Sequence, residues 1–221
     1  MIMREEIIRY VLKEKVIAIV RGIESTKCMR VAEALYEGGI RLVEVTFNQS
    51  EPASFAATAD TIATINKKYE GKMLVGAGTV TTTELVELAA KAGAKYIISP
   101  DTNIDVIRKT RELGLVSMPG AMTPTEIMTA HYAGADFVKL FPTGNLGADY
   151  VKAVRAPISH IKLLAVGGIN EKNIADYLKV GMCGAGVGGN LANKKWIDNG
   201  EYGKITETAR MLVEAVKSVE S

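Results

Sequence analysis

In VIAIVRGIESTKCMRVAEALYEGGIRLVEVTF, residues 16–47, two apolar runs flank an amphipathic segment. The first run, VIAIV, and the last, LVEVTF, are rich in the β-branched residues typical of buried strands. Apolar residues between them recur at the i, i+3, i+4 spacing of a helix, in the segment CMRVAEALYEGG. A strand, a helix and a second strand in this order predict a unit with two parallel strands.

The same alternation continues along the chain. Strands are expected at residues 16–20, 42–47, 73–75, 96–99, 115–118, 137–141, 162–166 and 183–187. Eight strands separated by amphipathic helices predict an α/β fold, the (β/α)8 TIM barrel. The alternative is an open, doubly wound sheet, but such sheets usually have fewer units, and no GxGxxG motif follows the first strand.

Helix ends carry local signals of their own. Glycines just before the next strand are expected to end helices in the left-handed conformation, namely Gly39, Gly93, Gly114, Gly134 and Gly181. Helix N-caps are expected at Ser25, Thr81, Thr123 and Asn170, with Pro124 in a first turn. The segment from 201 to 221 predicts the last helix, and the N-terminal segment predicts an extra helix beneath the barrel. Because no linker interrupts the pattern, residues 1–221 are predicted to form a single domain.

Composition excludes several classes of protein. The chain has 221 residues, of which 48% are hydrophobic, and its 27 basic and 25 acidic residues give a net charge of +2. Since these charges do not form runs, nucleic acid is an unexpected partner. No apolar stretch approaches the roughly 18 residues of a membrane span. Cys28 and Cys183 lie far apart without metal-ligand spacing, which is typical of buried thiols, so a cytoplasmic location is expected.

Lys139 is the strongest candidate for chemistry. It lies in the apolar run FVKLF, where Phe137, Lys139 and Phe141 share one face of the predicted strand. If the other face packs on the helices, Lys139 points into the barrel, where desolvation lowers the pKa of an amine. A neutral amine can attack a ketone, so Lys139 is a candidate nucleophile. The alternative is a strand-end lysine whose amine reaches water.

Glu44 is the same case with the opposite charge. In LVEVTF it shares a face with Leu42 and Thr46, which directs its carboxyl group into the barrel. A buried acid near an amine could act as a general acid and base, because forming and breaking an imine requires proton transfers. The alternative is a buried ion pair with Arg21 or Lys139.

Other candidates lie at strand ends, where TIM barrels carry their active sites. Arg21 directly follows the first strand and could hold a carboxylate with two hydrogen bonds. Thr79 offers a hydroxyl beside a backbone that Gly76 and Gly78 make more flexible. Two glycine pairs, Gly167-Gly168 and Gly188-Gly189, follow the last two strands and are candidates for phosphate binding through backbone amides. Glycine in a tight turn is the alternative explanation.

These residues lie in motifs that resemble the KDPG/KHG aldolase family, enzymes that cleave 2-dehydro-3-deoxy-6-phosphogluconate and 4-hydroxy-2-oxoglutarate. The resemblance spans nearly the whole chain. It rests on VIAIVRG at 16–22, VEVTF at 43–47, VGAGTV at 75–80, YIISP at 96–100, MPGAMTPTE at 118–126, VKLFP at 138–142, AVGGI at 165–169 and GVGGNL at 186–191.

The resemblance implies a homotrimeric class I aldolase of carbohydrate metabolism, of the Entner–Doudoroff type, that needs no metal or cofactor. It implies that the substrate is a 2-oxo acid such as a phosphorylated sugar acid, cleaved to pyruvate and an aldehyde, glyceraldehyde 3-phosphate or glyoxylate. Lys139 would then form the Schiff base and Glu44 would transfer protons. Arg21 and Thr79 would bind the pyruvate carboxylate, and Phe141 would form a wall of the pocket.

Three positions depart from the pattern of the family. Some members have an arginine where this chain has Asn48, which would leave the carboxylate to Arg21. Many gluconate-specific members read PTGG where this chain reads AVGG, with Val166 in place of threonine, and galactonate-cleaving relatives are more similar there. Gly189 replaces a phosphate-binding serine. The alternative substrate is therefore 2-dehydro-3-deoxy-6-phosphogalactonate.

Two further readings remain open. A barrel isomerase or synthase acting on phosphorylated sugars would explain the glycine pairs but would give Lys139 no role. A noncatalytic ligand-binding barrel would make Lys139 and Glu44 an ion pair.

Overall fold

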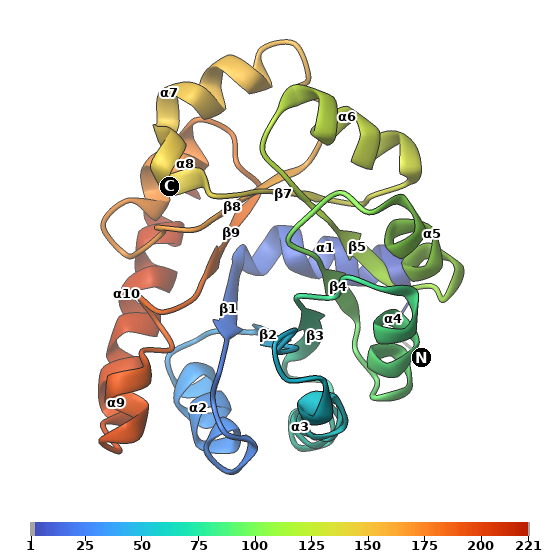
Figure 1. The fold of residues 1–221 in the computed structure, drawn as a ribbon. Coiled ribbons are helices and arrows are strands. Elements are labelled where there is room, and N and C mark those ends of the chain that lie inside the picture. Colours follow the sequence, from blue (N-terminus) through green and yellow to red (C-terminus); the bar gives the residue numbers. More distant parts are fainter. Residues whose placement is uncertain (1–2, 221) are drawn as a thin grey trace.

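The computed structural model describes residues 3–220 and shows parallel strands closed into a barrel inside a ring of helices (Figure 1). The strands are β1 (Val16–Val20), β2 (Leu42–Thr46), β3 (Leu74–Gly78), β4 (Tyr96–Ile98), β5 (Val116–Met118), β6 (Gly120–Ala121), β7 (Val138–Leu140), β8 (Leu163–Val166) and β9 (Gly184–Val187). The helices are α1 (Arg4–Glu14), α2 (Ser25–Glu37), α3 (Phe55–Lys68), α4 (Thr83–Lys91), α5 (Ile104–Glu112), α6 (Pro124–Ala133), α7 (Thr143–Arg155), α8 (Ile174–Lys179), α9 (Lys194–Asp198) and α10 (Tyr202–Glu220), with a 3-10 turn η1 (Pro52–Ser54).

The predicted TIM barrel is confirmed, and a short additional strand, β6, follows the strand predicted at residues 115–118. The sheet order is β5-β4-β3-β2-β1-β9-β8-β7-β6, so its two ends are adjacent in the chain and are separated only by Pro119. Proline has no N–H group to donate to a neighbouring strand, but the Pro119 carbonyl still accepts a hydrogen bond from the Lys139 amide at 2.8 Å. Together β5 and β6 therefore serve as one strand that closes the barrel.

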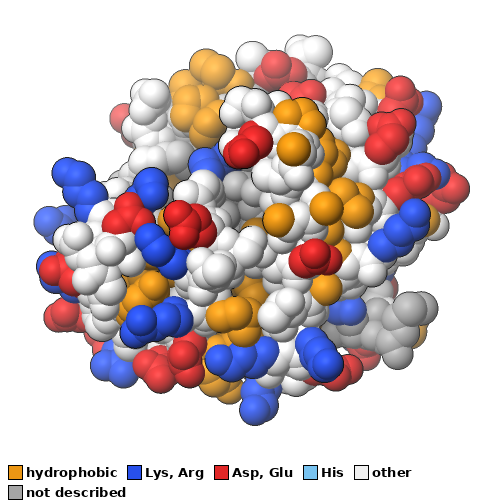
Figure 2. Space-filling model, turned by 60° about the horizontal axis from the view of Figure 1, so that its bottom comes forward, with side chains coloured by type: hydrophobic (Ala, Val, Ile, Leu, Met, Phe, Trp, Pro, Cys, Tyr) orange, Lys and Arg blue, Asp and Glu red, His pale blue; other side chains and the backbone are white. Residues whose placement is uncertain are grey.

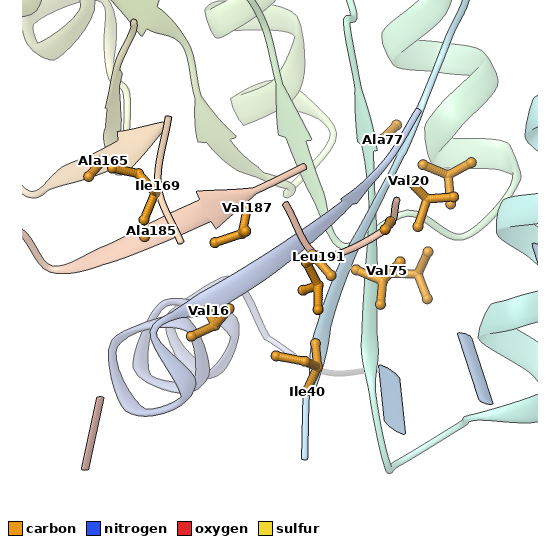
Figure 3. Close-up of a cluster of buried hydrophobic side chains, with 14 of the residues drawn as sticks. Val16, Val20, Ile40, Val75, Ala77, Ala165, Ile169, Ala185, Val187 and Leu191 are labelled. Atoms are coloured by element: carbon orange, nitrogen blue, oxygen red, sulfur yellow. The ribbon is translucent and has the colours of Figure 1, made fainter. Parts of the chain in front are cut away.

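Alternation along each strand creates two separate cores. Side chains that point outward pack beneath the helices, among them Val16, Val20, Val75 and Val187, which Figure 3 shows around β1 and its neighbours. Side chains that point inward form a smaller cluster within the barrel, including Ile17, Leu42, Leu74, Tyr96, Val116, Phe137 and Leu164. The inward cluster comes mainly from the first half of each strand, so apolar side chains fill the lower part of the barrel.

Helix α1 covers this lower end. Its buried residues Ile7, Ile8 and Val11 belong to the same cluster as the inward residues of the strands. The predicted extra N-terminal helix is therefore confirmed, and it leaves the opposite end of the barrel, at the carboxyl ends of the strands, as the open face.

The observed helix ends can be compared with the glycines and N-cap residues predicted from the sequence. All five glycines expected to end helices have positive φ values, from 73° at Gly114 to 104° at Gly134. Thr123 caps α6 as predicted, with Pro124 in the first turn. The other predicted caps are wrong by one to three residues: the N-cap position is Glu24 rather than Ser25 in α2, Thr82 rather than Thr81 in α4, and Asn173 rather than Asn170 in α8. Of these three, only the Thr82 side chain accepts a capping hydrogen bond, and neighbouring Thr or Asn residues have such similar capping chemistry that the sequence could not choose between them in α4 and α8.

The surface fits the balanced composition. Acidic and basic side chains are intermingled over the face shown in Figure 2, in keeping with a net charge of +2. Among the described helices, none combines the length and apolarity needed to cross a membrane. Both cysteines are free thiols, but only Cys28 is buried as predicted, while Cys183 is partly exposed.

Asp136, just before β7, joins three elements at the lower end of the barrel. Its Oδ1 accepts hydrogen bonds from Arg4 of α1 and, at 3.4 Å, from Arg111 of α5. Its Oδ2 accepts the backbone N–H of Ser117 in β5 at 2.9 Å, and the carboxyl group is only 4% exposed. A buried carboxylate with this many donors ties the cover helix to the closing strand.

We expect Asp136→Ala to lower the free energy of unfolding by about 2 kcal/mol, because the Ser117 amide would lose its acceptor and two guanidinium groups their anion. Urea denaturation measures the change. Asp176→Ala is the control, because that carboxylate is 67% exposed and its ion pair is 3.9 Å long, so the loss should stay below about 0.5 kcal/mol. Equal losses in the two variants would contradict a special role for Asp136.

Candidate active site

Lys139 lies where the strand pattern predicts. Its neighbours in β7, Val138 and Leu140, pack in the outer core, whereas Lys139 points into the barrel and is 5% exposed. In the sheet it lies beside Gly120 of β6 and Leu164 of β8. Its Nζ lies 4.9 Å from the centroid of the Phe141 ring, so an aromatic side chain forms part of the surroundings of the amine.

Glu44 also points into the barrel, from the middle of β2, and is 1% exposed. Its carboxyl group occupies the space that a side chain at residue 78 would fill, because a Cβ on Gly78 would lie only 1.7 Å from Oε1. Among the described residues, neither carboxylate oxygen has a hydrogen-bond partner. An unpartnered buried carboxyl group is costly and needs an explanation beyond packing.

The two groups shift each other's protonation through burial and charge. Burial raises the pKa of Glu44, and the positive charges of Lys139 and Arg21 oppose that change. Burial lowers the pKa of Lys139, and here the charge of Glu44 opposes while that of Arg21 adds to the decrease. Desolvation is the largest cause in both cases, so burial shifts each group toward its neutral form.

Thr79 has a strained backbone. It follows β3 directly with a φ of 56°, which is rare for a β-branched residue and costs about 1–3 kcal/mol. Its hydroxyl oxygen is buried and has no hydrogen-bond partner among the described residues. A strained residue that holds a free hydroxyl at a cavity wall suggests that the hydroxyl serves a ligand.

The predicted residues lie around one cavity of about 530 Å³ at the open end of the barrel. Its lining includes Arg21, Thr79, Lys139, Phe141, Val166, Gly167, Gly168, Gly188 and Gly189. Every predicted site residue is present except Glu44, which is buried beside Gly78. Arg21 and Thr79 also line an adjoining cavity of about 330 Å³, together with Asn48 and Gln49. The size of the larger cavity suits a small-molecule substrate.

Val166 and the glycine pairs at the cavity differ in how tightly their surroundings restrict the choice of residue. Val166 ends β8 and is 6% exposed, and a Cβ on Gly186 would lie 3.0 Å from its Cγ2. Gly167 and Gly168 have φ values of 91° and 77°, so glycine is needed there by the backbone. Gly189 has open space around it, with nothing within 4 Å of an added Cβ, so a larger residue would fit.

The sequence did not point to several features of the site. Gly76 and Gly78 belong to β3, which is longer than predicted, and they make room for Tyr96 and Glu44 rather than loosening a loop. Their alternation in GAG was a usable signal, because glycine in a strand often marks a close approach. Gln49 was missed: its Nε2 donates to the Thr79 carbonyl at 2.7 Å, and its Oε1 accepts from Thr81 at 3.2 Å. These bonds tie the loop after β2 to the loop after β3.

The described part of the chain holds no cluster of side chains suited to a metal ion. Within residues 3–220, no group of three or more His, Cys, Asp or Glu side chains is arranged to bind one. The site offers an amine, a guanidinium group and a hydroxyl at one cavity, with a carboxyl group buried beside Gly78.

The shifted pKa of Lys139 predicts how the rate of its chemical modification depends on pH. An amine reacts only when deprotonated, so its modification by an amine-reactive reagent should speed up as the pH rises, with a midpoint below 10.5. In Glu44→Gln the midpoint should fall further, because the charge that favours the ammonium form is gone. Peptide mass spectrometry of samples taken across a pH series measures the midpoint, with Glu214→Gln on α10 as the control. The same midpoint in all three proteins would contradict the coupling.

Comparison with known proteins agrees with this geometry. Residues 7–208 match the family model described as KDPG and KHG aldolase. A probable 2-dehydro-3-deoxy-6-phosphogalactonate aldolase of Rhizobium meliloti (strain 1021) is 37% identical over 181 residues, 81% of this chain and 82% of the relative. The native KDPGal structure superposes with a TM-score of 0.82 at 32% identity, covering 93% of this chain and 95% of that chain. KDPG aldolase of Legionella pneumophila, solved with pyruvate as a covalent carbinolamine, gives a TM-score of 0.80 at 26% identity, covering 90% and 94%. This chain belongs to the KDPG and KHG aldolase family.

Proposed function

We propose that this aldolase cleaves a phosphorylated 2-dehydro-3-deoxy sugar acid through a Schiff base on Lys139, releasing pyruvate and glyceraldehyde 3-phosphate. The observation that carries the proposal is the buried amine of Lys139, whose pKa is lowered by desolvation, at the floor of an open cavity. A free amine near neutral pH is what attack on a ketone requires. The carbinolamine in the Legionella relative is formed with pyruvate, which supports the same chemistry here.

The reaction can be written with the residues of this site. The neutral amine of Lys139 attacks the keto carbon, and loss of water gives a protonated imine. Removal of the proton from the C4 hydroxyl then breaks the C3–C4 bond, and its electron pair moves into the imine to give an enamine while the aldehyde leaves. Protonation at C3 and hydrolysis release pyruvate and restore the free amine.

Glu44 transfers the protons in these steps. Water must leave the carbinolamine as a protonated group, and the C4 hydroxyl must lose a proton later, so the reaction needs an acid and a base, and one carboxyl group can serve as both. The raised pKa of Glu44 brings its acid form closer to neutral pH, and its carboxyl oxygens have no other partner among the described residues. A group of this kind typically contributes 10²- to 10⁴-fold to the rate.

Arg21 and Thr79 bind the carboxylate of the substrate. Arg21 forms no ion pair among the described residues, and both residues line the larger cavity. A guanidinium group holds a carboxylate through two parallel hydrogen bonds, and the free Thr79 hydroxyl supplies a further donor. Because Asn48 carries no charge, Arg21 is the cation that neutralises the carboxylate.

The glycine pairs bind the phosphate. Gly167, Gly168, Gly188 and Gly189 line the cavity wall that lies after β8 and β9, where barrel enzymes frequently bind phosphate through backbone amides. Glycine lets the backbone come close to the ligand because there is no side chain in between.

A galactonate-type substrate is the second candidate, and Val166 favours it. The side chain is apolar and lies at the cavity wall, so it cannot hydrogen-bond a hydroxyl group of the sugar acid. The Rhizobium relative is named for the galactonate epimer, and a 2-dehydro-3-deoxy-phosphogluconate aldolase of Haemophilus influenzae (strain ATCC 51907 / DSM 11121 / KW20 / Rd) is 27% identical over 214 residues. Cleavage of 4-hydroxy-2-oxoglutarate to pyruvate and glyoxylate uses the same chemistry without the phosphate.

The chain is further proposed to act as one domain in a cytoplasmic homotrimer within an Entner–Doudoroff type of pathway. Family membership supports the trimer, and light scattering in solution would test it.

Lys139→Arg should keep the positive charge and the fold but abolish turnover, because a guanidinium group does not form a carbinolamine under these conditions. Wild-type protein incubated with pyruvate and borohydride should gain a stable adduct on Lys139, detected by peptide mass spectrometry, and the variant should gain none. Lys172→Arg, in the loop before α8, is the control and should keep the adduct. Variant activity within tenfold of wild type would rule out Lys139 as the nucleophile.

Val166 should make the enzyme a weak discriminator between the two C4 epimers. An apolar wall rejects a misplaced hydroxyl only about 10²-fold, whereas a hydrogen-bonding residue discriminates more strongly. We expect the kcat/KM values of the two epimers to lie within about 10²-fold of each other, and Val166→Thr to shift the ratio toward the gluconate form. Retro-aldol assays of both epimers in both proteins give the ratio. A gluconate preference above about a thousandfold that Val166→Thr leaves unchanged would place selectivity elsewhere.

A further inference from the structure

Tyr96 lies under the site and reaches across three strands. It starts on β4, and its ring occupies the space beside Gly76 of β3, where an added Cβ would lie 2.1 Å from two ring carbons. Its hydroxyl donates a hydrogen bond to the Val43 carbonyl of β2 at 2.7 Å and lies 3.4 Å from the Leu74 carbonyl of β3. The side chain is completely buried. Tyr96 is therefore a cross-brace that joins β4 to β2 over a strand whose glycine leaves room for it.

The brace ends next to Glu44. Val43, which accepts the hydrogen bond, is the residue before Glu44, and Gly76 is the Cα partner of Glu44 in the register of β2 and β3. The ring of Tyr96 lies against Gly76, and the Glu44 carboxyl group lies against Gly78, two residues further along the same inward face. The two side chains are thus stacked along β3, with Tyr96 nearer the lower end of the barrel.

Glu44 depends on such support because its carboxyl group has none of its own. Neither oxygen has a hydrogen-bond partner among the described residues, so the position of the group follows from its backbone and from the walls around it. The hydroxyl of Tyr96 stays neutral, because burial and then the charge of Glu44 raise its pKa well above 10.0. It can therefore act as a constant hydrogen-bond donor to the Val43 carbonyl while Glu44 gains and loses a proton.

We infer that Tyr96 is a positioning residue that sets the location of the Glu44 carboxyl group through the backbone of β2. The inference rests on the proposed role of Glu44 in proton transfer. Small displacements of a reacting group can lower a rate strongly, and a shift of about 1 Å costs as much as 10²-fold. Losing the Tyr96 hydroxyl should therefore affect the proton-transfer steps more than the binding of substrate.

The test is Tyr96→Phe, which removes the hydroxyl and keeps the ring beside Gly76. We expect kcat for retro-aldol cleavage to fall about tenfold and KM to change less than about twofold. The adduct trapped on Lys139 with pyruvate and borohydride should still form, because the nucleophile is unaltered. Tyr177→Phe is the control: that residue is buried in the outer core, its hydroxyl lies 3.5 Å from the Thr143 carbonyl, and kcat should stay within about twofold of wild type.

A double-mutant cycle with Glu44→Gln separates positioning from general stability. If Tyr96 acts through Glu44, Tyr96→Phe should lower kcat no further once Glu44 is replaced. A fall in melting temperature with kcat unchanged, or a loss that multiplies with that of Glu44→Gln, would overturn the inference while leaving the roles of Lys139 and Glu44 intact. If Glu44→Gln itself leaves kcat unchanged, both the inference and the proposed role of Glu44 are wrong, although adduct formation would still support Lys139.

Discussion

The limited space inside an eight-stranded barrel is the constraint on which this site depends. Every second residue of each strand points inward, and an interior of this size is normally filled by side chains. In the lower half large apolar residues fill it, closed off by α1. There Gly76 leaves space that the Tyr96 ring occupies, and higher up Gly78 and Gly186 leave space that Glu44 and Val166 occupy from neighbouring strands. The carboxyl group of Glu44 therefore lies in space that a glycine provides.

Burial along the barrel axis arranges the chemistry. Glu44 is 1% exposed and Lys139 is 5% exposed, whereas Phe141 at the rim is 41% exposed and Arg21 is open to solvent. The two groups with shifted pKa values lie where desolvation is strongest, and Arg21, the proposed binder of the carboxylate, lies where water can reach it. A substrate in this cavity would place its keto carbon in the low-dielectric region and its phosphate toward the glycine loops.

The buried ionisable groups and the strained backbone of this site lower the stability of the folded state. Two ionisable side chains are buried, and the carboxyl oxygens of Glu44 have no hydrogen-bond partner among the described residues. The backbone of Thr79 is held in a strained conformation. Such costs persist only where the surrounding structure determines the positions firmly. Here the surroundings include the outer core beneath the helices, the Tyr96 brace and the Gln49 side chain that bonds to the Thr79 carbonyl.

The sequence by itself determined the barrel, because the alternation of strand and helix periodicities and the glycine helix ends are local patterns, and these predictions are confirmed. It also predicted that Lys139 and Glu44 point inward, since alternation within a strand settles which residues share a face, and the packing of Val138 and Leu140 in the outer core confirms the direction for Lys139. The catalytic and binding roles stay predictions. Only the tertiary structure decided that Gly78 faces Glu44, that Gly76 faces Tyr96, and that Gln49 reaches Thr79. These contacts depend on the register between strands that are distant in the sequence, and a register is set by how whole strands and helices pack together, which no local pattern encodes.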